Sequence, residues 1–162
     1  MALNAYLRVV GQKSGEIKGS VTQKGREGRI GVIALWHDIV TPRDPASGLP
    51  TGKRQHTPLI ITKELDAASA PLHAVQASNE NLKEWELLFY RPSPTGVEQQ
   101  HFTIRLTNAS VAAIDMRMPN NKHADLMKLE TYEEVAFTYE KIEWIWVDGN
   151  LSAVDDWGAP VV

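Results

Sequence analysis

Five carboxylates lie close together near the C-terminal end of the sequence, where they could take part in acid/base chemistry. Glu130, Glu133 and Glu134 come first, and Glu140 and Glu143 follow. Two carboxylates on either side of a sugar linkage can hydrolyse it, so Glu133 and Glu143 form a candidate glycosidase pair. Charges at the entrance of a β-strand, however, more often protect a sheet edge against aggregation. A solvated strand edge is therefore the preferred interpretation, and a monomeric β-barrel glycosidase or ligand-binding module the alternative.

The histidines, serines and cysteines give no further sign of catalysis. No two histidines stand one helical turn apart, as many metal ligands do, and no serine lies in a G-x-S-x-G sequence. The chain has no cysteine, which excludes a disulfide framework, a thiolate zinc site and a cysteine nucleophile. We therefore expect no catalytic residue, no metal and no cofactor. The histidines in question are His37, His56, His73, His101 and His123.

Two glycine-rich stretches are similar to phosphate-binding loops, but neither fits the chemistry. Residues 25–31 (GREGRIG) lack the G-x-G start and lead into an expected strand, whereas a phosphate site needs the N-terminus of a helix. Residues 48–54 (GLPTGKR) are one residue too short for a P-loop, and Arg54 stands where a serine or threonine would bind magnesium. We expect no nucleotide site in either stretch.

Length and charge bound the partners of the chain. The 162 residues suit a single domain, residues 1–162, and the net charge of −3 provides no basic excess for nucleic acid. The N-terminal residues have no signal-peptide pattern, and no stretch approaches the roughly 20 apolar residues of a membrane span. We expect a protein made in the cytoplasm, without membrane insertion, which would need a route other than general secretion to leave the cell.

Strand-forming residues dominate the pattern, and one short helix interrupts them. The helix is expected at residues 69–78, where Ser69 and Pro71 are start signals and Leu72 and Val75 share a face. The predicted fold is mainly β: an antiparallel β-barrel with one short flanking α-helix and a long extended loop. The β-prone stretches are residues 4–10, 29–40, 57–62, 83–91, 101–106, 109–118 and 134–147.

Two of these stretches, residues 29–40 and 134–147, are apolar on both faces. A strand in a barrel needs only one apolar face, so a second cover must exist. It could be the helix or a loop of the same chain, or a neighbouring subunit, because obligate interfaces are as apolar as a core. On the second interpretation, Trp36, Trp144 and Trp146 are candidate interface residues.

The order of short sequence blocks along the chain resembles the haemolysin-coregulated protein (Hcp) family. The resemblance extends from about Ala5 to about Trp146; residues 119–132 match only loosely, and the tail after Val147 matches nothing. Each block is weak alone, and their joint order is specific. The blocks are Tyr6-Leu7, Gly19-Ser20, Gly25 to Ile30, His37 to Ile39, Pro42, Asp44-Pro45, Ser47-Gly48, Gly52 to Arg54, His56, Pro58, Thr62-Lys63, Asp66, Phe89 to Arg91, Thr103-Ile104, Leu106 and Glu133 to Trp144.

This resemblance implies a structural protein of the type VI secretion system of Gram-negative bacteria. Members form homohexameric rings that stack into an inner tube, which lies in a contractile sheath, carries a VgrG-type spike protein and is expelled. Effector proteins can travel in the lumen. The resemblance therefore implies secretion to the medium or a target cell without a signal peptide, and no catalytic residue or cofactor. A phage tail-tube protein, with the same architecture, is the nearest alternative.

The resemblance also gives a role to the long connection at residues 41–53, with its three prolines and two glycines. Loops beyond about 12 residues are usually functional or disordered, and proline stiffening argues against disorder. We expect an extended arm that contacts an adjoining subunit or the next ring. The alternative is a hairpin that folds back on its own barrel. The candidate contact residues are Pro42, Arg43, Asp44, Pro45, Pro50, Lys53 and Arg54.

Overall fold

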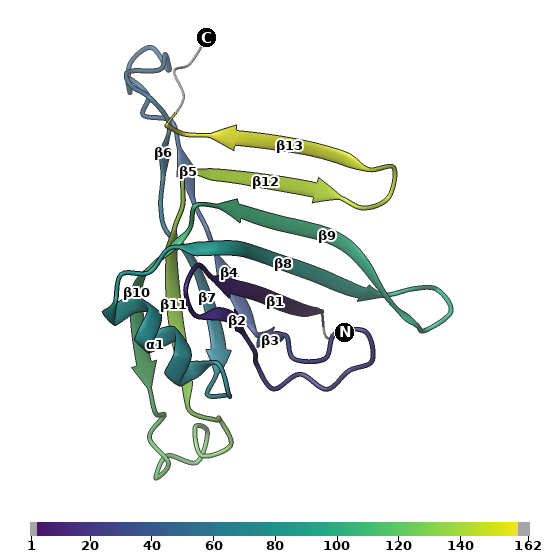
Figure 1. Ribbon diagram of the computed structural model, residues 1–162. Helices are drawn as coiled ribbons and strands as arrows, with labels where there is room; N and C mark the ends of the chain where they lie inside the picture. Colours follow the sequence, from purple (N-terminus) through teal and green to yellow (C-terminus); the bar gives the residue numbers. More distant parts are fainter. Residues whose placement is uncertain (1–2, 159–162) are drawn as a thin grey trace.

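Two antiparallel sheets, a separate two-stranded ribbon and one helix make up the protein in the computed structural model, which describes residues 3–158 (Figure 1). The seven-stranded sheet has the order β13-β12-β9-β8-β1-β2, with β3 also paired to β1, and the four-stranded sheet has the order β10-β11-β7-β4. The seven strands are β1 (Asn4–Gly11), β2 (Gly15–Ile17), β3 (Ile30–Val32), β8 (Leu82–Pro92), β9 (Glu98–Thr107), β12 (Lys141–Trp146) and β13 (Leu151–Asp156). The four are β4 (Ala34–Trp36), β7 (Leu59–Glu64), β10 (Ser110–Arg117) and β11 (Tyr132–Thr138).

The mainly β fold with a single helix is confirmed among the described residues, but the closed barrel is not. The strands of the two sheets cross steeply (Figure 1), and no continuous ladder joins the sheets. They are linked by a hydrogen bond of 2.9 Å from Ile33 N to Thr62 O and by an isolated bridge between Leu82 and Ala109. The chain itself passes from one sheet to the other at bends, as in orthogonally packed sheets.

One such bend explains why residues 134–147 are apolar on both faces. Val135, Phe137 and Tyr139 are buried, and after the bend the next buried residue is Ile142. The inward-facing positions thus change from odd to even numbers between β11 and β12, which belong to different sheets. The stretch is two strands in different sheets, each with its own core-facing positions, and Ala136 on the other face of β11 is buried as well.

The same change occurs between β3 and β4. Ile30 and Val32 are buried in the seven-stranded sheet, whereas Leu35 packs against the core from the four-stranded sheet. Ile33, at the bend, is 62% exposed and Trp36 is 54% exposed. Ala34, Ile39 and Val40 are exposed as well, so the chain itself covers only part of the apolar surface of residues 29–40.

The helix α1 (Ser69–Ala77) closes the core between the sheets. Leu72 and Val75 are its buried residues and join the central cluster, in which Trp85 and Phe137 meet edge to face at 5.4 Å. The helix ends one residue earlier than expected, because Ser78 is its C-cap and Asn79, at φ 51°, turns the chain away.

Candidate assembly surface

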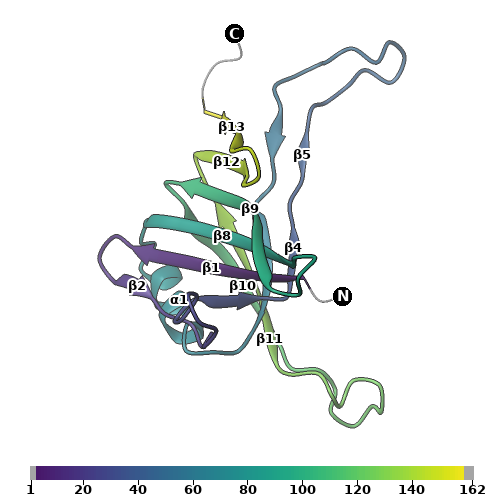
Figure 2. The same cartoon turned by 90° about the vertical axis from the view of Figure 1, so that its right-hand side faces the viewer.

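The long connection forms a hairpin that projects from the sheets, here called the ribbon and comprising residues 38–57 (Figure 2). Its strands are β5 (Ile39–Val40) and β6 (Gln55–His56). Further out, Thr51 N donates to Pro42 O at 2.9 Å, and Asp44 N donates to Leu49 O at 2.9 Å. The ribbon thus satisfies its backbone groups within itself. It does not fold back over the sheets, as the alternative interpretation required (Figure 2).

The charged residues of the ribbon tip build its turn. Asp44 accepts hydrogen bonds from Ser47 Oγ at 2.6 Å and from Ala46 N at 3.1 Å, and these bonds lower the pKa of Asp44. Arg43 Nη1 donates to Gly48 O at 3.2 Å. Gly48 has φ 72°, a conformation that glycine adopts without strain. Leu49 beside it is 65% exposed, so the tip presents an apolar side chain on a rigid turn.

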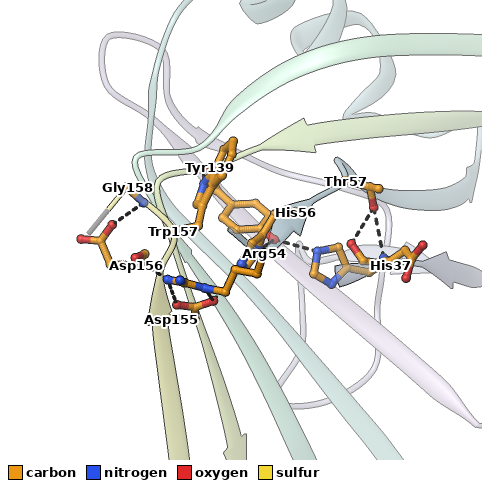
Figure 3. Close-up of polar contacts among 10 residues, drawn as sticks. His37, Arg54, His56, Thr57, Tyr139, Asp155, Asp156, Trp157 and Gly158 are labelled. Atoms are coloured by element: carbon orange, nitrogen blue, oxygen red, sulfur yellow. Dashed lines mark hydrogen bonds and ion pairs between the residues drawn. The ribbon is translucent and has the colours of Figure 1, made fainter. Parts of the chain in front are cut away.

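Arg54 has a partner in its own chain. Its guanidinium binds Asp155 of β13 in a two-pronged arrangement, with Nε 2.6 Å from Oδ2 and Nη2 2.5 Å from Oδ1, and Nη2 also donates to Asp156 O at 3.0 Å (Figure 3). The structure therefore uses the charge of Arg54 to hold the ribbon to the seven-stranded sheet.

Two histidines hold the base of the ribbon at a shared tyrosine (Figure 3). Tyr139 Oη lies 2.7 Å from His37 Nε2 and 2.6 Å from His56 Nδ1, and His56 Nε2 lies 2.8 Å from Asp155 Oδ2. Trp157 stacks on the His56 ring and donates from Nε1 to Tyr139 O at 2.6 Å. We call these residues, with Arg54, the base cluster. Sequence analysis missed it, because its members are up to 120 positions apart.

Burial and charge shift the pKa values in the base cluster. Burial raises the pKa of Tyr139, with a smaller contribution from Asp155, and burial lowers the pKa of His37, as does the nearby His56. The hydrogen bond from Arg54 lowers the pKa of Asp155. An Asp-His-Tyr arrangement could relay protons in an enzyme, but Tyr139 is only 5% exposed and offers a substrate no access. Its role here is structural.

The candidate tryptophans do not form one surface. Trp36 lies on β4 in the four-stranded sheet, and Trp144 and Trp146 lie on β12 in the other. Trp144 packs against the core, whereas Trp146 is 37% exposed, with the Arg91 guanidinium 5.3 Å from its ring centre. Trp36 and Trp146 thus mark two separate exposed apolar regions.

A second apolar projection is the β10–β11 loop, residues 118–131, which extends from the opposite end of the molecule to the ribbon (Figures 1 and 2). Met118 is 72% exposed, Met127 61% and Leu129 56%. Sequence analysis assigned nothing here. A signal was present, since apolar side chains recur in a segment whose Pro119, Asn120 and Asn121 predict turns.

The proposed glycosidase pair is not an active site. Glu133 is fully buried and its Oε1 lies 2.6 Å from Lys63 Nζ, whereas Glu143 belongs to the other sheet and lies beside Arg105. Within residues 3–158 no group of histidine and carboxylate side chains has the arrangement of a metal site, and no helix is long and apolar enough to cross a membrane.

Comparison with known proteins identifies the family. The family model described as "Type VI secretion system effector, Hcp" matches residues 6–146. The "Major exported protein" of Pseudomonas aeruginosa is 36% identical, with 99% of each chain covered. Two solved structures are also similar. The Hcp1 protein of an E. coli EAEC 042 pathovar, a double mutant, has a TM-score of 0.85 and 34% identity, covering 96% of this chain and 99% of its own.

The secreted protein Hcp3 of Pseudomonas aeruginosa has a TM-score of 0.79 and 30% identity, covering 96% of this chain and 99% of its own. All of these similarities span nearly the full chain, and so include both the sheets and the ribbon. The chain therefore belongs to the Hcp family of type VI secretion proteins, whose members are exported tube components and not enzymes.

Proposed function

We propose that this tube protein assembles into homohexameric rings, and that the rings stack through the ribbon. The observation that carries the proposal is a rigid hairpin of 20 residues, 38–57, that projects away from the sheets (Figure 2). A hairpin that projects from the sheets can reach a neighbouring subunit, which a protein that forms a polymer requires. The candidate contacts on it are Pro42, Arg43, Asp44, Pro45, Pro50 and Lys53, with Arg54 fixing its base.

Stacking has a candidate acceptor at the other end of the molecule. The β10–β11 loop exposes Met118, Met127 and Leu129, and the ribbon tip exposes Leu49. Surfaces at opposite ends of one protein generate a head-to-tail contact, which repeats without limit and builds a filament. Methionine side chains adapt readily to an incoming apolar group. We infer that the ribbon of one ring reaches the β10–β11 loop of the next.

Ring formation would cover the open end of the seven-stranded sheet. Trp146 pairs with Leu151 across β12 and β13, so the two side chains share a face, and Leu151 is 66% exposed. Beyond them β13 is an edge strand with unpaired backbone groups. A neighbouring copy could cover this face and Trp36 on the opposite sheet, which gives each subunit two different lateral surfaces, as a ring requires.

The remaining partners follow from the family. We propose that the assembled tube binds a VgrG-type spike protein, lies within a contractile sheath, carries effector proteins in its lumen and leaves the cell without a signal peptide. Export is supported by the relatives named "Major exported protein" and "Secreted protein Hcp3". No property of the described residues points to nucleic acid, since the net charge is −3.

Replacing residues 42–52 with a short Gly-Ser turn tests the role of the ribbon. We expect the sheets to stay folded, because changing the length of a loop alters stability by only about 1 kcal/mol, while stacking is lost. Circular dichroism checks the fold, and sedimentation velocity with negative-stain microscopy checks the assembly. A matched control replaces the exposed β8–β9 turn at residues 93–96. Tubes that form equally well in both variants would refute the proposal.

A further inference from the structure

The base cluster fixes both ends of the ribbon through one hydroxyl group. His37 precedes β5 and His56 belongs to β6, so one histidine stands at each end of the hairpin. Both rings contact Tyr139 Oη, at 2.7 and 2.6 Å. A phenolic hydroxyl has one proton to donate and lone pairs to accept with. The two contacts therefore depend on how many protons the two imidazoles carry.

With both imidazoles neutral, the three contacts that link His37, Tyr139, His56 and Asp155 are satisfied together. Asp155 can only accept, so His56 Nε2 carries the proton that faces it, and His56 Nδ1 is then an acceptor. Tyr139 Oη donates to that nitrogen and accepts from His37 Nε2. The hydrogen bonds form one directed chain from His37 to Asp155.

One added proton leaves the chain intact. If His56 becomes an imidazolium, its Nδ1 donates to Tyr139 Oη, and the hydroxyl turns to donate to a neutral His37 Nε2. A second proton breaks the arrangement, because both histidines then donate to Oη and the hydroxyl proton has no acceptor. The two cations would also stand 6.3 Å apart, measured between ring centres.

The surrounding charges do not compensate for the second cation. Asp155 is already paired with Arg54 and His56, and Asp156 follows it on β13 with its main-chain oxygen bound to Arg54. Asp38 is adjacent to His37 and favours its charged form. Burial outweighs that effect, so the pKa of His37 lies below its ordinary value. Glu140, next to Tyr139, is exposed.

We propose that the base cluster is a pH-sensitive latch, which fixes both ends of the ribbon while at most one of His37 and His56 is protonated and loosens the contact with Tyr139 when both are, with the Arg54–Asp155 pair still in place. The pKa of His37 is lower in the folded chain than its ordinary value near 6.5. The stabilisation that neutral His37 gives to the ribbon is therefore fully present above about pH 6.5 and is lost as the pH falls through the pKa of His37 in the folded chain. Loosening therefore requires a pH below the ordinary histidine value near 6.5. The consequence for tubes rests on the proposed function: assembly through the ribbon weakens there.

Amide hydrogen exchange in the ribbon tests the latch directly. We expect the protection of the Thr57 amide, which donates to Asp38 O at the base of the ribbon, to fall at least tenfold, after correction for intrinsic exchange rates, between pH 7 and pH 5 in the wild-type protein. His37→Gln keeps a donor at this position without a titrating charge, and should remain protected at pH 5. His123→Gln, on the exposed β10–β11 loop, is the matched control and should behave as the wild type. Equal protection of the wild type at both pH values would overturn the proposal.

Imidazole NMR titration provides the second measurement, which does not depend on how well glutamine fits. Ribbon opening should follow the midpoint at which the second of the two imidazoles becomes protonated. Opening that follows the higher midpoint, or neither, contradicts the latch. Tyr139→Phe, which removes the shared hydroxyl, should lower the protection of the Thr57 amide at pH 7 and remove its dependence on pH.

The latch and the tube can fail separately. Ribbon exchange and imidazole titration report on the latch whether or not rings form, and sedimentation at pH 7 and pH 5 reports on assembly. Tubes that persist at pH 5 around an opened ribbon would refute the link between the two, while absence of tubes at pH 7 would refute the proposed function alone.

Discussion

Individual residues in this chain often have roles different from those their type suggests. The sequence predicts that Arg54 contacts another subunit, but in the structure it binds Asp155 of its own chain. The sequence favours a solvated strand edge for Glu133, which is instead a fully buried anion. Lys63 Nζ contacts Glu133 Oε1 at 2.6 Å, Asp66 Oδ1 at 2.9 Å and Ser69 Oγ at 3.0 Å, so it ties β7, β11 and the start of α1 together. Removing any one partner of such a buried cation is expected to destabilise the fold.

Glu133→Gln should therefore destabilise the fold. It removes the fully buried one of the two carboxylates that contact Lys63 Nζ and leaves only Asp66 as an anionic partner, so we expect the free energy of unfolding to fall by about 2–3 kcal/mol. Urea unfolding measures the change. Glu130→Gln, at an exposed position nearby, should alter it by less than about 0.5 kcal/mol. Equal stability of the two variants would show that the buried pair is not needed.

At the scale of elements, the fold depends on the places where strands change sheet. The shift of the buried positions between Tyr139 and Ile142, and between Val32 and Leu35, lets one continuous stretch contribute strands to both sheets around a single core. The connection from β2 to β3 passes very close to the backbone at the start of β3. A Cβ atom at Gly19 would lie 2.5 Å from Arg29 O and 2.7 Å from Ile30 Cα, both of them backbone atoms. Only glycine fits there.

Gly19→Ala is expected to lower the free energy of unfolding by about 1–3 kcal/mol, because the β2–β3 connection must move away from β3. Thermal or urea unfolding measures it. Gly31→Ala is the matched control, since its Cβ would meet only Val21 Cγ2 at 3.6 Å, and its effect should be below about 1 kcal/mol. A Gly19→Ala variant as stable as Gly31→Ala would show that the close approach is not constrained.

The whole molecule has surfaces that suit repetition: a ribbon at one end, an apolar loop at the other, and exposed tryptophans on two sheets. Trp146→Ser tests the lateral surface. We expect the protein concentration needed to form rings to rise at least tenfold. The melting temperature of the subunit should change little, because this side chain is 37% exposed and lies at a strand end. Sedimentation velocity over a dilution series measures the change.

The control for this variant is Val97→Ser, which alters an equally apolar but turn-located side chain, 67% exposed, beside β9. Rings of Trp146→Ser that dissociate at the same concentration as rings of Val97→Ser would place the lateral contact elsewhere, with Trp36 as the next residue to change.

The sequence by itself determined the class of fold, the helix and the family. Local propensity and turn signals at Ser69, Pro71 and the prolines of residues 42–50 suffice for the elements, and the order of short blocks suffices for the family, because both are properties of neighbouring residues. Only the tertiary structure decided that the sheets stay open and that the apolar faces of residues 134–147 belong to two strands. It alone brought His37, His56, Tyr139 and Asp155 together at the base of the ribbon. Contacts between residues so far apart depend on how strands pair and bend, which no local pattern encodes.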